Sequence, residues 1–272
     1  MKKNDILSDT QAQSDPRKVE LNKVGIRDLK LPLKIVDRRQ GHQQVVANLN
    51  IGVNLSKDQR GAHLSRFVEI AEKYRRSEFT FESVPEFLAE LKQRLNSTNA
   101  YASFKFDYFI EKTSPASENR GLMDFNCGFG GFSEGGDTKT WLEAEVPLTT
   151  LCPCSKENSA SGAHNQRAIV RSRAVINKML WLEEFIELIE SEASSQLYSL
   201  LKREDEAYVT DQAYQNPKFV EDIVRDLSLS LQKEPAIEDF WLECTSFESI
   251  HNHNAYASVS HGEFWKDSGK IY

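Results

Sequence analysis

Hydrophobic and polar residues alternate in several stretches of the chain, and a period of two is typical of strands that bury one face. The clearest example is the segment 102–110, where Phe104, Phe106 and Tyr108 are separated by Lys105 and Asp107. The pattern predicts strands over 31–36, 45–53, 102–110, 140–148, 168–176, 239–247 and 253–260.

Apolar residues at helical spacing predict helices between these strands. They are expected over 63–74, from Ser83 onward, over 181–202 and from Asn216 onward. Ser83 forms a capping box with Glu86, and Pro85 falls in the first turn, where its missing N–H costs nothing. The segment 113–137 is rich in Gly, Ser and Asn and is expected to be a loop.

The predicted elements follow the same order twice, strand, strand, helix, helix, strand, strand, although seven strands are predicted where two full copies need eight. Such an order favours an α+β protein with antiparallel sheets that carry helices on one face. The polar residues 1–25 precede the first repeat, and we expect them to form a flexible tail.

Composition excludes several classes of protein. The 272-residue chain has 34 basic and 41 acidic residues, a net charge of −7, whereas a general nucleic-acid binder needs clustered Lys and Arg. No run approaches the roughly 20 apolar residues of a membrane span, and the N-terminus lacks the apolar core of a signal peptide. Four cysteines without a disulfide-rich pattern are typical of a reducing compartment. We therefore expect a cytoplasmic protein with no nucleic-acid or membrane partner.

The first candidate for chemistry is a pair of cysteines followed by a histidine. Cys152 and Cys154 flank Pro153, and His164 follows shortly after. Thiolate and imidazole are ligands of catalytic transition metals and also the parts of thiol-based sites. The spacing does not match a structural zinc site built from two C-x₂-C pairs. Metal chemistry, thiol chemistry and a buried structural pair are the interpretations open at this point.

Two further clusters contain candidate ligands. Glu248 and His251 fall in a predicted turn between strands and His253 at the start of the next strand, and solvated histidines are the alternative. The acidic residues 204–206 are expected at the end of the long helix, where they oppose its dipole. A charged surface explains such a run, but a broken local rule also marks functional sites. Glu221 is expected near a helix start at the edge of a pocket.

Guanine presents two parallel N–H donors that a single carboxylate accepts, whereas a triphosphate binds to Lys, Arg and backbone N–H groups. The candidates for phosphate contacts near the cysteine motif are Lys156, Arg167, Arg171 and Arg173, and any of them could also be ordinary surface. Among the basic residues of this region, we predict that Lys156 and Arg167 bind substrate.

Five motifs occur in a recognisable order: LCPCSKE at 151–157, GAHNQR at 162–167, REDEAYVT at 203–210, NPKFVED at 216–222 and FESIHNHNAYA at 247–257. In the first half, KDQRGAHLSRFVE at 57–69 and GLMDFNC at 121–127 fit the same pattern. Together they resemble the prokaryotic type IB GTP cyclohydrolase I family, and the resemblance covers about 20–265.

The resemblance implies tandem tunnelling-fold (T-fold) domains at 26–137 and 138–272, each a four-stranded antiparallel sheet with two helices on one face. The second domain would carry most site residues. The implied reaction converts GTP and water to 7,8-dihydroneopterin triphosphate and formate. This is the first step of tetrahydrofolate biosynthesis, and it also feeds 7-deazaguanine and queuosine synthesis. A homo-oligomer is implied as well, typically a tetramer with sites where subunits meet.

Position by position, the resemblance also implies roles for residues. The metal ligands would be Cys152, His164, Glu206 and His251. Cys154 would contact the substrate near the reacting carbon, and Glu221 would anchor the guanine edge. Glu248 and His253 would lie in the site with acid–base or positioning roles. A mixed Cys, His and Glu set does not select one metal, so zinc, manganese and iron(II) are all expected candidates.

Two other functions stay open. One is a T-fold enzyme that reduces a nitrile on a deazaguanine, which needs a cysteine nucleophile and NADPH but no catalytic metal. The other is a non-catalytic module that binds purines or stores metal. The pairs Cys152/His164 and His251/His253 favour a metal-dependent function over the metal-free reductase.

Overall fold

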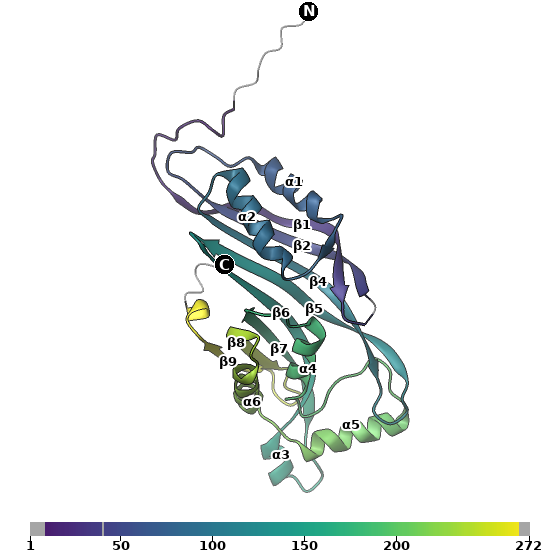
Figure 1. Ribbon diagram of the computed structural model, residues 1–272. Helices are drawn as coiled ribbons and strands as arrows, with labels where there is room; N and C mark the ends of the chain where they lie inside the picture. Colours follow the sequence, from purple (N-terminus) through teal and green to yellow (C-terminus); the bar gives the residue numbers. More distant parts are fainter. Residues whose placement is uncertain (1–8, 40, 267–272) are drawn as a thin grey trace, which may run out of the picture. The chain divides into compact units, whose positions relative to one another are not determined.

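The structure is a computed structural model that describes residues 9–39 and 41–266. Within this part of the chain the strands are β1 (Leu21–Asp37), β2 (Gly41–Leu55), β3 (Glu78–Phe79), β4 (Asn99–Thr113), β5 (Arg120–Glu134), β6 (Asp137–Leu151), β7 (Asn165–Ile176), β8 (Ile237–Ser246) and β9 (Ala255–His261). The helices are α1 (Leu64–Tyr74), α2 (Ser83–Leu95), α3 (Pro153–Asn158), α4 (Leu182–Glu190), α5 (Arg203–Gln215) and α6 (Val220–Lys233). The predicted α+β class is confirmed. Neighbouring strands are hydrogen-bonded in the order β3-β1-β2-β4-β5-β6-β7-β8-β9 (Figure 1).

The chain folds into two compact units that alternate along the sequence. The first contains the described residues up to Val36, Gln44–Phe104 and Gly130–Thr140. The second contains Asp37–Gln43, Lys105–Phe129 and the described residues from Trp141 onward. Strands β4, β5 and β6 therefore contribute residues to both units. The predicted boundary between 137 and 138 separates two sequence repeats, whereas the compact units are defined by contacts between residues. The predicted T-fold domains stay a prediction.

The first part of the chain differs from the flexible tail predicted over 1–25. Residues 1–8 lie outside the described residues, and β1 already begins at Leu21. Between them, the carbonyls of Gln11 and Gln13 accept hydrogen bonds from the N–H groups of Gly61 and Arg60, at 3.2 and 2.9 Å. This backbone pairing attaches the segment to the loop that precedes α1, a contact that a polar composition does not reveal.

Helices α1 and α2 pack against each other in the first unit. The rings of Tyr74, Phe79, Phe87 and Phe104 form a cluster with centroid distances between 4.6 and 6.2 Å. The predicted capping box of α2 is wrong. The Ser83 hydroxyl accepts the N–H of Thr80 at 3.1 Å. It therefore bonds to the turn before the helix and not to an N–H group of the helix itself.

The predicted loop over 113–137 is also wrong, because it contains strand β5. Met123, Phe125 and Cys127 are buried and alternate with exposed Asp124 and Asn126, so the period of two was present. The glycines of this segment hid it, since glycine is depleted in strands. At Gly131 an added Cβ would lie 2.5 Å from Val84 Cγ1 of α2, so the missing side chain lets the helix approach the strand.

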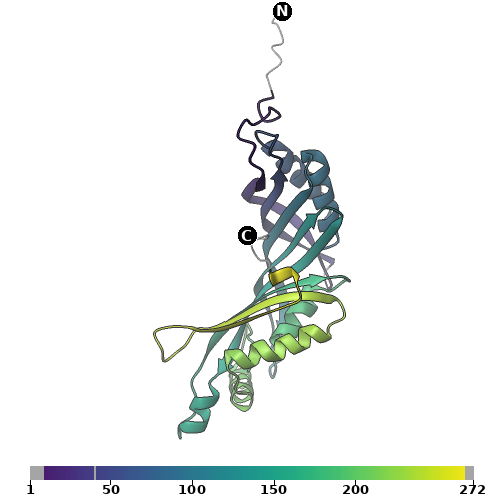
Figure 2. The same ribbon diagram turned by 90° about the vertical axis from the view of Figure 1, so that its left-hand side faces the viewer.

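The second unit contains four consecutive antiparallel strands, β6 to β9. Helix α6 packs on β8 and β9 (Figure 2), and α4 contacts α6. Every second residue of β8 is buried, including Phe240 and Leu242, and α6 buries Ile223, Leu227 and Leu231. This arrangement is the repeat predicted from the sequence. In the described residues, none of the helices is both long and apolar enough to cross a membrane.

The long helix predicted over 181–202 is wrong, because α4 ends at Glu190. Beyond it, Ser194 N–H donates to Thr149 O, and Thr149 N–H donates to Ser195 O, each at 3.1 Å. These bonds to β6 replace the helical ones. The acidic residues 204–206 consequently lie in the first turn of α5, where they favour the helix dipole instead of opposing it. The last helix likewise begins at Val220 and not at Asn216.

A buried ion pair holds the segment after α4 in place. Lys112 Nζ on β4 lies 2.5 Å from Glu190 Oε1 and donates to the carbonyl of Leu197 at 2.8 Å. The side chains of Lys112 and Glu190 are 10% and 4% exposed. Burial lowers the pKa of Lys112 and raises the pKa of Glu190, which is the expected direction for charges removed from water.

We expect Lys112→Met to lower the free energy of unfolding by about 3–5 kcal/mol, because Glu190 is left buried without a counter-charge. Urea denaturation followed by circular dichroism measures the change. Lys178→Met at an exposed position is the control and should stay within about 0.5 kcal/mol. Adding Glu190→Leu should recover most of the loss, and an unaltered Lys112→Met variant would contradict the assignment.

Candidate functional site

Cys152 and Cys154 lie in different environments at the end of β6. Cys152 is half-buried and forms the N-cap of α3, where its Sγ accepts the N–H of Ser155 at 3.4 Å. Pro153 occupies the first helical position, as its fixed φ favours. Cys154 is exposed one residue further along. The short helix α3 turns the two thiols to different surroundings.

The pairing of β6 with β7 brings His164 next to Cys152. Leu151 pairs with Asn165 at the end of the two strands, and Cys152 N–H donates to His164 O at 3.1 Å. The N–H of His164 in turn reaches the Ser155 hydroxyl at 3.4 Å. The residues between them form α3 and its exit. The sequence pair predicted for metal or thiol chemistry is thus a spatial pair.

A hydrogen-bond chain connects His164 to Glu248. Gln166 Nε2 donates to Glu248 Oε1 at 3.4 Å, and its Oε1 lies 2.9 Å from His164 Nδ1. Because a carboxylate only accepts, the Gln166 amide must present N–H to Glu248 and its oxygen to His164. His164 therefore carries its proton on Nδ1, which leaves Nε2 with a free lone pair for a ligand or proton.

The loop after β8 is attached to this chain at its beginning. Glu248 accepts the hydroxyl of Ser246 at 2.9 Å, and Ser249 Oγ lies 3.4 Å from His164 Nδ1. Phe247 N–H donates to Arg167 O at 2.9 Å. The exposed side chain of Arg167 lies on the same strand as Gln166.

His251 and His253 follow on the same loop. Their rings stack with centroids 5.2 Å apart, and both residues are exposed. His253 Nδ1 lies 3.1 Å from Asn252 Oδ1. The predicted cluster of histidines is therefore real, and it lies on the loop that begins at Glu248.

Glu206 lies in the first turn of α5 and is exposed. At the other end of this helix, Lys156 from α3 donates to the carbonyl of Tyr214 at 2.5 Å and lies 4.6 Å from the centre of its ring. Lys156 thus connects the cysteine motif to α5. Its predicted contact with substrate stays a prediction beside this structural contact.

Glu221 belongs to a groove between α6 and β9. The groove has a volume of about 560 Å³ and is lined by Glu221, Val224, Arg225, Ser228 and Leu229 on the helix and Ala257, Ser258 and Val259 on the strand. Glu221 is exposed in the first turn of α6, which agrees with the pocket-edge position predicted for it.

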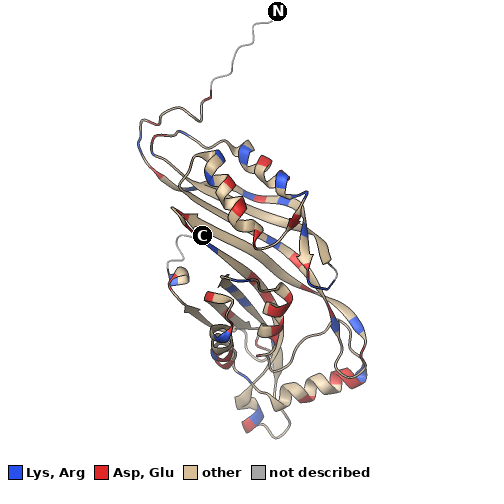
Figure 3. Cartoon of the chain, in the orientation of Figure 1, with Lys and Arg blue, Asp and Glu red and all other residues tan. Residues whose placement is uncertain are grey.

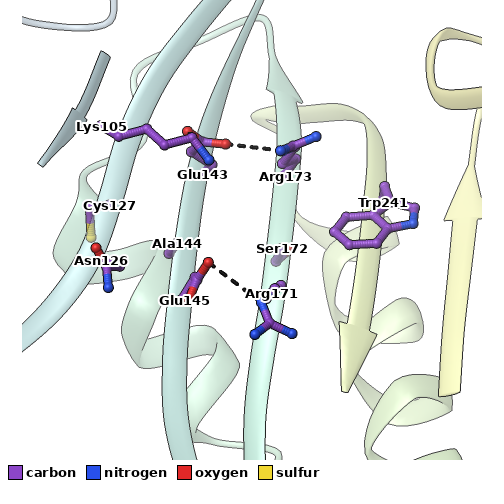
Figure 4. Close-up of a pocket in the computed structure, with 10 residues that line it drawn as sticks. All are labelled: Lys105, Asn126, Cys127, Glu143, Ala144, Glu145, Arg171, Ser172, Arg173 and Trp241. Atoms are coloured by element: carbon purple, nitrogen blue, oxygen red, sulfur yellow. Dashed lines mark hydrogen bonds and ion pairs between the residues drawn. The ribbon is translucent and has the colours of Figure 1, made fainter. Parts of the chain in front are cut away.

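Arg171 and Arg173, considered above as phosphate ligands, lie in a different cavity of about 220 Å³ on β4 to β8 (Figure 4). Arg173 Nε pairs with Glu143 at 3.0 Å, and Arg171 lies 3.5 Å from both Glu145 and Glu243. The guanidinium groups of Arg171 and Arg173 are therefore paired with carboxylates of the protein, which accounts for their positive charges without a phosphate.

Cys127 and Cys244 are both buried. Burial raises the pKa of both thiols, that of Cys244 to about 12. Neither is a nucleophile at neutral pH, which agrees with a structural role for both.

The donors at Cys152 and His164 fit a divalent transition metal by their chemistry, since one is a thiolate ligand and the other presents Nε2. Glu206 and His251 lie on α5 and on the β8–β9 loop. Within residues 9–39 and 41–266, no group of three His, Cys, Asp or Glu side chains is close enough to hold a metal ion. The single chain places the backbones of Cys152 and His164 side by side, and the four-ligand set stays a prediction.

Sequence reasoning missed Gln166 and Asp205, which connect the candidate residues to the fold. Gln166 lies two residues after His164 on a strand, so both side chains point to one face, and this spacing was an available signal. Asp205 gave no comparable signal, because three of its four hydrogen bonds come from Ala116 and Ser117 on the distant turn between β4 and β5, and only the one from Lys202 is local.

Comparisons with known proteins agree over nearly the whole chain. A family model described as "Type I GTP cyclohydrolase folE2" matches residues 7–257. A protein of Magnetococcus marinus named GTP cyclohydrolase FolE2 is 44% identical over 257 residues, which cover 94% of this chain and 97% of the relative. One of Syntrophotalea carbinolica with the same name is 46% identical, covering 93% and 94%.

Among solved structures, uricase from Arthrobacter globiformis matches with a TM-score of 0.52 at 8% identity, covering 89% of this chain and 93% of that one. Urate oxidase from Bacillus subtilis gives a TM-score of 0.51 at 7% identity, covering 88% and 98%. At such identities the likeness concerns the fold alone, and it confirms the tunnelling fold.

We expect that in Gln166→Leu the His164 ring is no longer held in the Nδ1–H tautomer, because the oxygen that accepts the Nδ1 proton is lost. ¹⁵N NMR of the neutral imidazole should report Nδ1–H in the wild-type chain and a shift toward a mixture of tautomers in the variant. Gln212→Leu, at an exposed position of α5, serves as the control. A His164 tautomer that is the same in all three proteins would contradict the hydrogen-bond chain.

Proposed function

The chain belongs to the type I GTP cyclohydrolase FolE2 family, and from this we propose that it hydrolyses GTP to 7,8-dihydroneopterin triphosphate and formate. The proposal is supported by the name shared by relatives that are 43–46% identical over 93–94% of the chain. The comparisons name FolE2 and not type IB, so FolE2 is the family name used from here on.

The observation that carries the proposal is the spatial pair of Cys152 and His164. Their backbone groups are hydrogen-bonded at 3.1 Å, and the Gln166–Glu248 chain leaves His164 Nε2 available. We propose that this pair holds a divalent metal, zinc, manganese or iron(II), together with Glu206 and His251. The metal would supply Lewis-acid activation of water at neutral pH.

The other residues of the chain would bind and orient the substrate. The exposed Cys154 thiol would contact GTP near the reacting carbon of the base. Glu221, at the edge of the α6–β9 groove, would accept two parallel N–H donors of guanine. Lys156 and Arg167 would bind the triphosphate. Lys156 would give up its hydrogen bond to the carbonyl of Tyr214 to do so.

Proton transfers would involve Glu248 and His253. Glu248 accepts from Gln166 and Ser246, so it can hold a proton near His164 or stabilise the charge on that ring. His253 is exposed on the neighbouring loop. An imidazole in general titrates near neutral pH and suits repeated proton transfer.

We further propose that the site is completed in a homo-oligomer, expected to be a tetramer, with residues meeting across subunits. The exposure of Glu206, Glu221, His251 and His253 supports this, because a ligand-binding group gains from removal of bulk water. The product would enter tetrahydrofolate synthesis in the cytoplasm and would also supply 7-deazaguanine synthesis.

We expect Cys152→Ala and His164→Ala each to abolish pterin formation, measured as fluorescence after oxidation of the product, with formate measured in parallel. Chelator should abolish activity in the wild-type chain as well. His42→Ala, at an exposed histidine elsewhere, is the control. Activity that needs NADPH would favour the nitrile reductase, and nucleotide binding without product would favour a binding module. Normal turnover in either variant would remove the metal assignment.

We expect Glu221→Gln to weaken GTP binding about 10–100-fold, because an amide turns a donor toward a donor and hydrogen bonds to charged groups are worth about 1.5–3 kcal/mol. Calorimetric titration with GTP measures the affinity. Glu82→Gln, at an exposed glutamate of the first unit, should bind like the wild type. Equal affinity in Glu221→Gln and the control would remove Glu221 from the site.

A further inference from the structure

Helix α5 is held mainly at its two ends. Of its 13 residues only Asp205 and Ala213 are buried, so the body of the helix adds little to the core. A helix that is polar on nearly all sides does not take its position from a hydrophobic stripe. Whatever fixes α5 also fixes Glu206, which lies in its first turn.

At the beginning of α5, the Asp205 carboxylate is fully buried and accepts four hydrogen bonds. Its Oδ1 accepts the N–H groups of Ala116 and Ser117, both at 2.8 Å. Its Oδ2 accepts the Ser117 hydroxyl at 2.5 Å and the N–H of Lys202 at 2.7 Å. One side chain therefore joins the start of the helix to the turn between β4 and β5.

This turn is itself rigidly hydrogen-bonded. Ser114 N–H donates to Asn119 O at 2.8 Å, Asn119 N–H donates to Ser114 Oγ at 3.0 Å, and Asn119 Nδ2 donates to Ser117 Oγ at 2.7 Å. Asp205 thus binds a preformed set of donors. Burial alone would raise its pKa, but these hydrogen bonds outweigh burial and hold the pKa well below its usual range.

The far end of α5 is attached to the cysteine motif. Lys156 donates to Tyr214 O at 2.5 Å, and Asn216 Nδ2 donates to Ala193 O at 2.9 Å. Figure 1 shows α5 running from the β4–β5 turn to the region of α3, and Figure 3 shows acidic residues gathered at its beginning. These contacts fix the C-terminal end of α5 near the cysteine motif. The orientation of its first turn then depends on Asp205.

We propose that Asp205 is a positioning residue that fixes Glu206 for metal binding through the β4–β5 turn. The proposal rests on the function proposed above, in which Glu206 is a ligand. A carboxylate that is fully buried and bonded to two segments orients its neighbour without touching metal or substrate. Outer-shell groups that hydrogen-bond to a ligand typically contribute about 10–100-fold to metal affinity, and we expect an effect of that order from Asp205, which acts through the backbone.

The test is a double-mutant cycle on the full chain, with Zn²⁺ affinity measured by competition with a chromogenic chelator. Asp205→Asn should weaken Zn²⁺ binding about 10–100-fold, because an amide N–H would then face a backbone N–H, that of Lys202 in one orientation and those of Ala116 and Ser117 in the other. Asp205→Asn should add nothing to the loss caused by Glu206→Gln. Losses that multiply in the double variant would overturn the proposal, because Asp205 would then act independently of Glu206.

Asp211→Asn makes the same chemical change at an exposed position of α5 and should bind Zn²⁺ like the wild type. Ser117→Ala removes one of the four hydrogen bonds and should give a smaller loss; it replaces Asp205→Asn in the cycle if that variant does not fold. Wild-type affinity in both Asp205→Asn and Ser117→Ala would overturn the positioning role alone. Wild-type affinity in Glu206→Gln would instead contradict the ligand set of the proposed function.

Discussion

The antiparallel pairing of β6 with β7 is the constraint on which the candidate site depends. It runs without interruption from Trp141↔Val175 to Leu151↔Asn165. The chain must therefore reverse its direction between these strands, within α3 and the residues that follow it up to His164. Cys152 and His164 therefore meet one residue beyond the last pair of the two strands. A slip of one residue would turn every side chain of β7 to the opposite face and would separate His164 and Gln166 from Glu248.

Around this ladder the site is assembled from segments that carry little hydrophobic surface of their own. Helix α3 is six residues long with none buried, and α5 buries two. Their positions come from specific polar contacts: Lys156 to the end of α5, Asp205 to the β4–β5 turn, and Glu248 to Gln166 and Ser246. The sheet and α6 provide the rigid core, and the functional groups are attached to it by hydrogen bonds whose partners must all be satisfied.

This division explains which elements could be read from the sequence. The strands with clear alternation and the helices with an apolar stripe, such as α1 and α6, were predicted because burial on one face leaves a period in the chain. Strand β5 was missed because its glycines replace side chains where α2 approaches closely. The break after α4 was missed because it is caused by backbone pairing with Thr149 and by the buried Lys112–Glu190 pair, and neither leaves a local signal.

For the site, the sequence by itself determined the chemistry: the thiols, imidazoles and carboxylates stand in motifs that already indicate the family. The tertiary structure decided their relations. It put the acidic residues 204–206 at the start of a helix instead of its end, made Gln166 the link from His164 to Glu248, and gave Lys156 a partner on α5. The physical reason is that side-chain identity is a local property, whereas a hydrogen bond between segments 82 or 89 positions apart exists only once the sheet has brought them together.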